Sequence, residues 1–435
     1  MKKSLFAVAA LTAIAGAAQA QSSVTVYGLL DVGYIGGNAR VSNNQFTAKQ
    51  TNNQFGESAE STSRLGFKGV EDLGNGTSAF FTAEFALAPQ DQLSSGNTNG
   101  GLLNRQTFVG LKKNGIGQTA IGLQQTGIFN AVAATDPGQM NNVVGNVIYA
   151  STAGGSTSSD AGQNSIGFTN RVANTLSVQS DSFAGFRANA LYTLNNKNAS
   201  EYSSTTTTVG GTTNANGWGL GADYTLNKFY ITAQYQAFKQ LTSSTNGDLT
   251  TATPWTNPQA NGATSAPVSQ GAAAATSYGV RATGSVVTAG TAAVAYTGTN
   301  IQDNQFYAGA TYDFGILKAY ANYLNRKATA TESSNFYMKR QAEQIGIRSY
   351  ITPTIEAWAS AGLGRYTAAG SSNPTVNFNA WQLGSNYYLS KRTNLYAIYG
   401  QTLTSTAAIT SASGTTYGNN SSGASNYAIG VRHTF

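Results

Sequence analysis

The sequence predicts an all-β protein, a single transmembrane antiparallel β-barrel. Three observations lead to this prediction: segments of about ten residues that alternate apolar and polar side chains, an amino-terminal export signal, and a chain that ends within a strand on an aromatic residue. The end of a soluble domain usually frays. Together these features favour strands that cross a bilayer over the strands of a soluble sheet.

Period-two alternation is clear in VTVYGLLDVGY, where one face carries Val24, Val26, Leu30, Val32 and Tyr34. The same pattern recurs as hairpins in WGLGADYTLNKFYITAQY, FYAGATYDFGILKAYANY and WQLGSNYYLSKRTNLYAIY. Tyr and Phe gather near the segment ends, where an amphipathic ring can lie at the lipid headgroups. A large soluble β-sandwich would also alternate, but the export signal and the terminal strand favour the barrel.

The export signal occupies residues 1–20: MKK is the positive region, LFAVAALTAIAGAA the apolar core, and Ala18-Gln19-Ala20 the cleavage site. An uncleaved anchor is the alternative, but its apolar core is short for a helix that needs about 20 residues to span a bilayer. We expect the mature chain to start at Gln21 and residues 21–435 to form one barrel domain.

The composition limits the other classes of function. Charged residues make up 10% of the chain and aromatic residues 11%, which argues against disorder. The chain has no cysteine, so we expect neither disulfides nor thiol chemistry. The formal charge of +7 falls to +5 without Lys2 and Lys3, a bias too mild to indicate a nucleic-acid partner. Nothing in the sequence calls for a cofactor.

The last residues, SNYAIGVRHTF, predict the strand that closes the barrel. A barrel in lipid has no free edge, so its final strand must pair with the first. We expect Arg432 to point inward or lie at the rim, and four side chains to face lipid and to act in closure and assembly: Tyr427, Ile429, Val431 and Phe435.

Short turns alternate with long polar connections, as in barrels of the bacterial outer membrane, where the long loops are extracellular. Counting the alternating segments gives eighteen candidate strands, but the pair in TSYGVRATGSVVTAGTAAVAYTG is the least regular and is either two strands or part of a long loop. The sequence therefore predicts sixteen or eighteen strands, with sixteen favoured.

Four stretches resemble a known family: SRLGFKGVEDLGNG, NRQTFVGL, TLSVQSDSFAGF and the closing GVRHTF. They are similar to the trimeric general diffusion porins of Gram-negative outer membranes, of the β-proteobacterial type. The resemblance implies a homotrimer of sixteen-stranded, water-filled barrels, surrounded by lipid and lipopolysaccharide, in which the third extracellular loop folds inward.

The resemblance also implies a constriction with basic residues on one wall and carboxylates on the loop or the opposite wall. Its basic positions match Arg64, Lys68, Arg105 and Arg171, and its acidic positions match Glu84 and Asp136. The family commonly has Gly-Arg-Gln before the third loop, whereas this chain has Leu123 between Gly122 and Gln124. One cation of the pattern is therefore missing here.

The alternation of side chains along the strand predicts the same basic wall independently of the family resemblance. If Leu65 and Phe67 face lipid, Arg64 and Lys68 face the lumen, and a charge on the lipid face near the midplane would cost about 2–4 kcal/mol. Residues 125–170 are too long for an ordinary connection, and IFNAVAATDP and NVVGNVIYA are apolar enough to pack on a wall. We expect an inward-folded loop, with Asp136 facing the basic wall.

These features predict passive diffusion of small hydrophilic solutes and ions with a weak preference for anions. A substrate-specific channel is the main alternative, and eighteen strands would favour it. An enzyme is disfavoured, because His433 is the one histidine and lies on the lipid-facing parity. The same lack of ligands disfavours a metal site, and GIGQTA lacks the helix that a nucleotide-binding turn needs.

Overall fold

The computed structural model describes residues 23–42, 47–89, 103–149, 171–203, 208–245, 285–286, 294–295, 298–330, 337–369, 375–405, 409–410, 416–417 and 421–435. The predicted signal peptide, residues 1–20, and the expected mature start at Gln21 lie outside these residues. Their cleavage stays a prediction.

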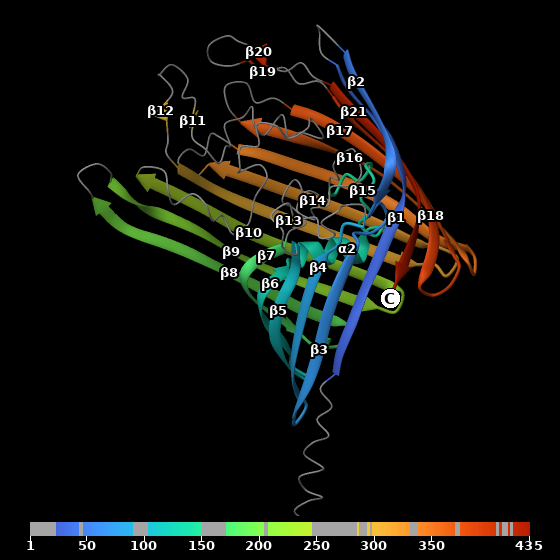
Figure 1. Ribbon diagram of the computed structural model, residues 1–435, viewed down its shortest axis with the longest axis horizontal. Coiled ribbons are helices and arrows are strands. Elements are labelled where there is room, and N and C mark those ends of the chain that lie inside the picture. Colours follow the sequence, from blue (N-terminus) through green and yellow to red (C-terminus); the bar gives the residue numbers. More distant parts are fainter. Residues whose placement is uncertain are drawn as a thin grey trace, which may run out of the picture.

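The strands wind into one antiparallel barrel (Figure 1). Its strands are β1 (Ser23–Ser42), β2 (Thr47–Glu57), β3 (Arg64–Gly74), β4 (Thr77–Ala86), β5 (Leu103–Lys113), β6 (Gly117–Gln125), β7 (Arg171–Ser180), β8 (Phe186–Ser203), β9 (Thr208–Leu226), β10 (Phe229–Thr245), β13 (Gly298–Asp313), β14 (Lys318–Ala330), β15 (Tyr337–Thr352), β16 (Ile355–Ala369), β17 (Thr375–Tyr388), β18 (Thr393–Thr404) and β21 (Ser421–Thr434). Two separate ribbons pair β11 (Ser285–Val286) with β12 (Val294–Ala295) and β19 (Ile409–Thr410) with β20 (Thr416–Tyr417).

Within the described residues the barrel has sixteen strands. The sheet contains 17 strand segments, but β2 and β3 both pair with β1 on the same side and count as one interrupted strand: Val32 pairs with Glu57, and Leu29 with Arg64. Of the stretch that left eighteen open, residues 276–298, the described part is β11, β12 and the first residue of β13. Because β11 and β12 pair outside the barrel, the prediction of sixteen strands is confirmed.

The last strand closes the barrel, because β21 pairs with β1 on one side and with β18 on the other. The Phe435 N–H donates to Gly28 O (3.1 Å), and the Gly28 N–H donates to Phe435 O (3.2 Å). A Cβ at Gly28 would lie 2.5 Å from the Phe435 ring. The terminal ring therefore lies on a position that only glycine leaves open.

Alternation holds on both faces. On β1 the outward side chains that the sequence pointed to are exposed, whereas Asp31 and Ile35 are buried inside the barrel. The tight turns suit their residues: Asn75 and Asn227 lie at positive φ (52° and 51°), which Asn tolerates better than most residues.

Residues 126–149, which follow β6, fold into the barrel, as expected for the third loop, and residues 150–170 of that expected loop lie outside the described residues. The described part forms α2 (Gly127–Thr135), where Thr126 caps the helix by accepting from the Phe129 N–H. The helix contacts β8, β9, β10, β13 and β14 and lies within the ring of strands in Figure 1. We call α2 and residues 136–149 the constriction loop. Among the described residues, no helix is long and apolar enough to cross a membrane.

Candidate pore constriction

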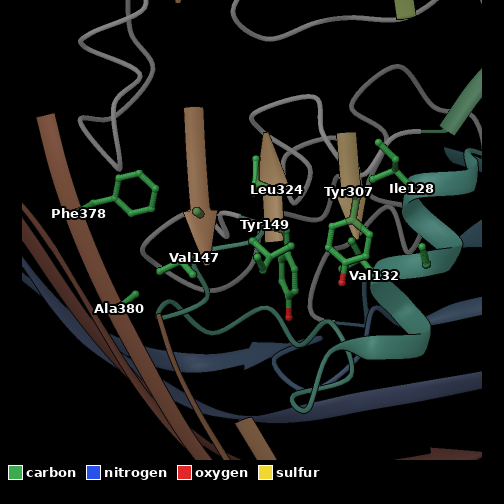
Figure 2. Close-up of a cluster of buried hydrophobic side chains, with 11 residues drawn as sticks. Ile128, Val132, Val147, Tyr149, Tyr307, Leu324, Phe378 and Ala380 are labelled. Atoms are coloured by element: carbon green, nitrogen blue, oxygen red, sulfur yellow. The ribbon is translucent and has the colours of Figure 1, made fainter. Parts of the chain in front are cut away.

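The constriction loop packs on one wall of the lumen. Ile128 and Val132 of α2 lie beside Tyr307 and Leu324, as Figure 2 shows. Further along the loop, other apolar side chains extend the same buried cluster to β15 and β17: Val147, Ile148 and Tyr149 pack with Ala342, Phe378 and Ala380. Burying such side chains stabilises the contact by roughly 1.5–3 kcal/mol each. We call β13 to β18 the covered wall.

Polar side chains of the covered wall satisfy the backbone of the loop. Arg340 donates to the carbonyls of Val147 and Ile148, the latter at 2.9 Å. Gln382 donates to Val143 O (2.6 Å) and Val144 O (3.0 Å). Buried carbonyls without a partner would cost free energy, so these bonds allow an irregular segment to lie inside the barrel.

Two glycines let the loop approach the wall closely. A Cβ at Gly362 would lie 2.3 Å from Val147 Cγ2, and one at Gly400 would lie 1.7 Å from Val144 O. Neither distance is possible for a real side chain. The backbone of the covered wall is therefore in direct contact with the loop.

Asp136 lies inside the loop and is 3% exposed. Its carboxylate accepts from the Met140 N–H (2.7 Å), Asn146 (2.8 Å), Gln344 (3.1 Å) and the Tyr149 hydroxyl (3.2 Å). Burial raises the pKa of Asp136 above its usual value, and the hydrogen bonds act against this rise. The structure thus places Asp136 where its hydrogen bonds hold the loop together. Its predicted contribution to the electric field across the pore stays a prediction.

The opposite side of the lumen, β3 to β8, carries the basic residues that the sequence predicted for the constriction. We call it the bare wall. Arg105 and Glu84 form a buried ion pair there, with Nε and Oε1 2.6 Å apart. The charges of Arg64 and Arg171 also act on the Glu84 carboxylate, and the Tyr27 hydroxyl donates to it (3.1 Å). The structure brings three predicted arginines together around one predicted carboxylate, which lies on their own wall.

Arg171 and the fourth predicted cation, Lys68, lie at the edges of this group. The Arg171 guanidinium lies 4.8 Å from the centre of the Phe129 ring, which links the bare wall to α2. Lys68 is exposed, and its ammonium lies 5.4 Å from the centre of the Tyr27 ring. The bare wall therefore carries more positive than negative charge in the group that the sequence identified.

A hollow of about 300 Å³ lies between α2 and the bare wall. Carboxamides dominate its lining, with Gln106, Gln124 and Asn189 on the wall and Asn130 on α2. Such groups donate and accept hydrogen bonds without a net charge. This part of the path is polar and nearly neutral beside the arginine group.

The sequence analysis missed two parts of the site. One is the interruption between β2 and β3, which lies inside the barrel beside the loop. The other is the apolar character of the covered wall. Tyr307, Leu324 and Phe378 alternate with lipid-facing side chains, so their inward parity was the signal that would have identified the loop's binding surface.

A closed barrel of this strand number, narrowed from within by its third loop, defines an outer-membrane channel protein. The comparison with protein families makes the class specific: residues 7–407 match the Gram-negative porin family. The chain belongs to that family.

Individual relatives and solved structures agree. The chain is 27% identical to an outer membrane porin protein of Bordetella pertussis over the full length of both chains. It is 33% identical to outer membrane porin protein 32 of Delftia acidovorans, over 45% of this chain and 51% of that protein. The fold is similar to that of the anion-selective porin from Comamonas acidovorans, with a TM-score of 0.58 and 18% identity over 95% of this chain and 100% of that one. The trimer form of OmpT from Vibrio cholerae gives a TM-score of 0.54 with 13% identity, over 95% and 99% of the chains.

The protein is thus a porin of the Gram-negative outer membrane, a channel for the passive diffusion of small hydrophilic solutes. Family and fold are those of a channel rather than an enzyme. Among the residues that the structure describes, there is no group of three or more His, Cys, Asp or Glu side chains that would hold a metal ion.

Proposed function

We propose that the arginine group of the bare wall is the selectivity filter of this porin and gives it a weak preference for anions. One observation carries the proposal: Glu84 pairs with Arg105 at 2.6 Å on the wall that holds all four of the predicted basic residues, Arg64, Lys68, Arg105 and Arg171. The predicted carboxylate of the loop, Asp136, is covered. The name of the relative from Comamonas acidovorans, an anion-selective porin, supports the same sign.

Charges at a narrow neck act on every ion that passes, whereas distant surface charges are screened within about 8–10 Å at physiological salt. The formal excess of charge over the whole chain is therefore less important than the arginine group. The pair of Arg105 and Glu84 also holds two opposite charges at the lumen, where they orient water and favour hydrated solutes over apolar ones.

The test is the zero-current potential of the channel in a salt gradient across a planar bilayer. Replacing Arg64 and Arg105 together by Ala should shift the potential toward cation preference, because Glu84 is then left without its closest cations. The shift should grow at low salt, where the Debye length increases from about 10 Å at 0.1 M to about 30 Å at 0.01 M.

Lys49→Ala combined with Lys239→Ala is the matched control. Both lysines are exposed, in the strands β2 and β10. They lie outside the arginine group, so the control should change the potential little. A control shift as large as that of the arginine pair would place the filter elsewhere.

A substrate-specific channel loses its support from strand number, since the barrel has sixteen strands. The hollow lined by carboxamides is the one feature that favours it, because such groups suit a neutral hydroxylated solute. Conductance measured against rising concentrations of sugars distinguishes the two functions. A general pore shows no saturation, and saturation at low concentration would favour the specific channel.

We further propose that the protein is a homotrimer in contact with outer-membrane lipid and lipopolysaccharide, and that 427–435 act as the assembly signal. The fold shared with a trimer form of OmpT supports the first point. The pairing of β21 with β1 supports the second. Native mass measurement that finds monomers alone would contradict the trimer, and a folded barrel formed without residues 427–435 would contradict the signal.

A further inference from the structure

Residues 58–63, sequence SAESTS, leave the sheet between β2 and β3 and lie inside the barrel. We call them the inward bulge. All of them are buried except Ser61, which is half-buried. Ser58 begins the bulge at a positive φ of 60°, which is uncommon for a residue other than glycine. An uninterrupted strand would avoid this strain, so the contacts of the bulge must compensate for it.

Asp31 of β1 holds the bulge. Its Oδ2 accepts from the backbone N–H groups of Glu60 (2.8 Å) and Ser61 (2.7 Å). Its Oδ1 accepts from the Tyr396 hydroxyl (2.6 Å), on β18. The backbone of Asp31 adds two bonds, donating to Ser63 Oγ (3.0 Å) and accepting from the Ser58 N–H (2.8 Å). A buried carboxylate is costly unless donors surround it, and here three surround it.

Glu60 fixes the bulge from the side of the last strands. Its Oε2 accepts from Asn394 (3.0 Å) and forms an ion pair with Arg432 at 3.5 Å. Arg432 also donates to Asn394 Oδ1 (3.1 Å). These bonds join the bulge to β18 and β21, the two strands that follow β1 around the barrel.

The bulge in turn binds Asn142 and Val143, which we call the tip of the constriction loop. The Asn142 N–H donates to Ala59 O (2.9 Å), and Asn142 Nδ2 donates to Ser58 O (2.6 Å). Ala59 also packs with Val143 in a buried cluster that includes Trp358. These contacts fix Asn142 and Val143 between the bulge and the covered wall, where Gln382 donates to Val143 O.

The bulge also orients Arg64, the residue that follows it. Arg64 Nε donates to Thr62 O (2.9 Å), and Nη2 donates to Ser61 Oγ (2.7 Å). A long arginine side chain loses rotamer freedom in such a fork. The fork therefore holds the Arg64 guanidinium, and with it the positive charge, in one position at the lumen.

We infer that Asp31 and the inward bulge form a clasp that sets both sides of the neck at once: the reach of the constriction loop through Asn142, and the position of the Arg64 charge through Ser61. Asp31 is a positioning residue, since it touches neither solute nor ion. The second half of this inference rests on the proposed role of Arg64 in selectivity, and the first half does not.

Two single substitutions separate the halves. Asn142→Ala removes the side-chain bonds to Ser58 O and to Thr62 Oγ1 (3.4 Å), and the Arg64 fork uses two other oxygen atoms, Thr62 O and Ser61 Oγ. We expect higher single-channel conductance and more open-channel noise, with little change in the zero-current potential. Ser61→Ala removes the acceptor of Arg64 Nη2 and leaves the loop anchored, so the potential should shift toward cation preference at nearly constant conductance.

Asp31→Asn removes the negative charge that strengthens the bonds from Glu60, Ser61 and Tyr396. It should produce both changes together, while the heat-modifiable migration of the folded barrel is retained. Asp313→Asn is the matched control, because Asp313 Oδ1 accepts a backbone N–H (Gly315, 2.7 Å) in an exposed turn. The control should leave conductance and potential unchanged. If Asp31→Asn does not fold, the Asn142 and Ser61 variants decide the matter.

A reversible tether adds a rescue. The chain has no cysteine, so Ala59→Cys with Val143→Cys, added to Asn142→Ala, introduces the only thiols. Oxidation should return conductance and noise toward the wild-type values, and reduction should reverse this.

The clasp is overturned if folded Asn142→Ala conducts like wild type, or if oxidation of the tether has no effect on its conductance. Failure of the proposed filter looks different: Arg64→Ala and Ser61→Ala would both leave the potential unchanged, while Asn142→Ala would still alter conductance.

Discussion

The two walls of the lumen differ in what they bury. The covered wall binds the constriction loop with apolar side chains such as Tyr307 and Phe378, and its ion pair of Asp303 and Arg326 is closed to water, with the side chains 0% and 2% exposed. An ion pair of similar length joins Arg187 of β8, on the bare wall, to Asp223 of the next strand, β9, and the Arg187 side chain is 43% exposed. The same residue types thus stand in two different dielectric environments within one barrel.

This difference between the walls explains why the loop lies on one side of the lumen. Apolar side chains at inward positions of the covered wall bind the loop to that side. Charged side chains on the same wall form an ion pair, as Arg326 does, or bind the loop backbone, as Arg340 does. On the bare wall the pair of Arg105 and Glu84 is buried as well, but Lys68 is exposed and the Arg187 side chain is 43% exposed, so these two charges remain close to water. A barrel with a uniformly polar interior would give the loop no preferred side.

The largest expected effect is on the covered wall. Phe378→Ala should destabilise the protein by about 3–5 kcal/mol, because it leaves a cavity in the buried cluster, and it also removes the ring 5.4 Å below the Arg340 guanidinium. The loop should loosen, with more open-channel noise. The measurement is urea-induced unfolding in lipid vesicles, together with single-channel recording.

Phe108→Ala is the matched change on the bare wall. Phe108 lines the hollow and meets Phe80 edge-to-face, with ring centres 6.3 Å apart, so we expect a loss of only about 1 kcal/mol. Equal losses for the two variants would remove the distinction between the walls.

A second pair of variants compares the ion pairs. Asp303→Asn leaves the buried Arg326 charge without its carboxylate and should cost about 3 kcal/mol, at the low end for a broken buried pair. Asp223→Asn should cost about 1 kcal/mol or less, because water reaches Arg187. The free energy of unfolding of each variant gives the comparison, and a larger loss for Asp223→Asn would contradict it.

The smallest effect concerns pH. Burial raises the pKa of Asp136 in the folded loop, so the folded protein binds this proton more tightly than the unfolded chain. Stability should therefore increase as the pH falls from neutrality through the raised pKa toward the ordinary value near 4, and then level off.

Asp136→Asn should remove this contribution, so the difference in unfolding free energy between wild type and variant should change with pH in that window. A wild type that loses stability relative to Asp136→Asn as the pH falls would show that the sign is wrong.

Much of the fold followed from the sequence, because a barrel in lipid repeats one rule along every strand. Val24, Val26 and Val32 face outward as their parity predicted, and β21 closes the barrel. The grouping of Arg64 and Arg105 also agrees with their expected inward direction. These features depend on alternation and on the cost of unpaired backbone in lipid, both of which are local properties of a sequence.

The interior of the loop was not predictable in this way. Asp136 has the sequence context of an ordinary turn, and its burial depends on Gln344, which is far away in the sequence. The inward bulge reads as a polar connection, and its role depends on Asp31, Tyr396 and Asn142 meeting in space. Contacts between distant segments leave no periodic signal.

The hydrogen bond between Tyr396 and Asp31 joins residues 365 positions apart, and this has a consequence for the order of assembly. Contacts so distant along the chain pay the largest loop-closure entropy and form slowly. Because Asn394 and Arg432 hold Glu60 from β18 and β21, the bulge gains its last supports only when the final strands arrive. A barrel that still lacks β18 and β21 therefore lacks these supports of the bulge. The bore of the channel reaches its final width in the same step that closes the wall.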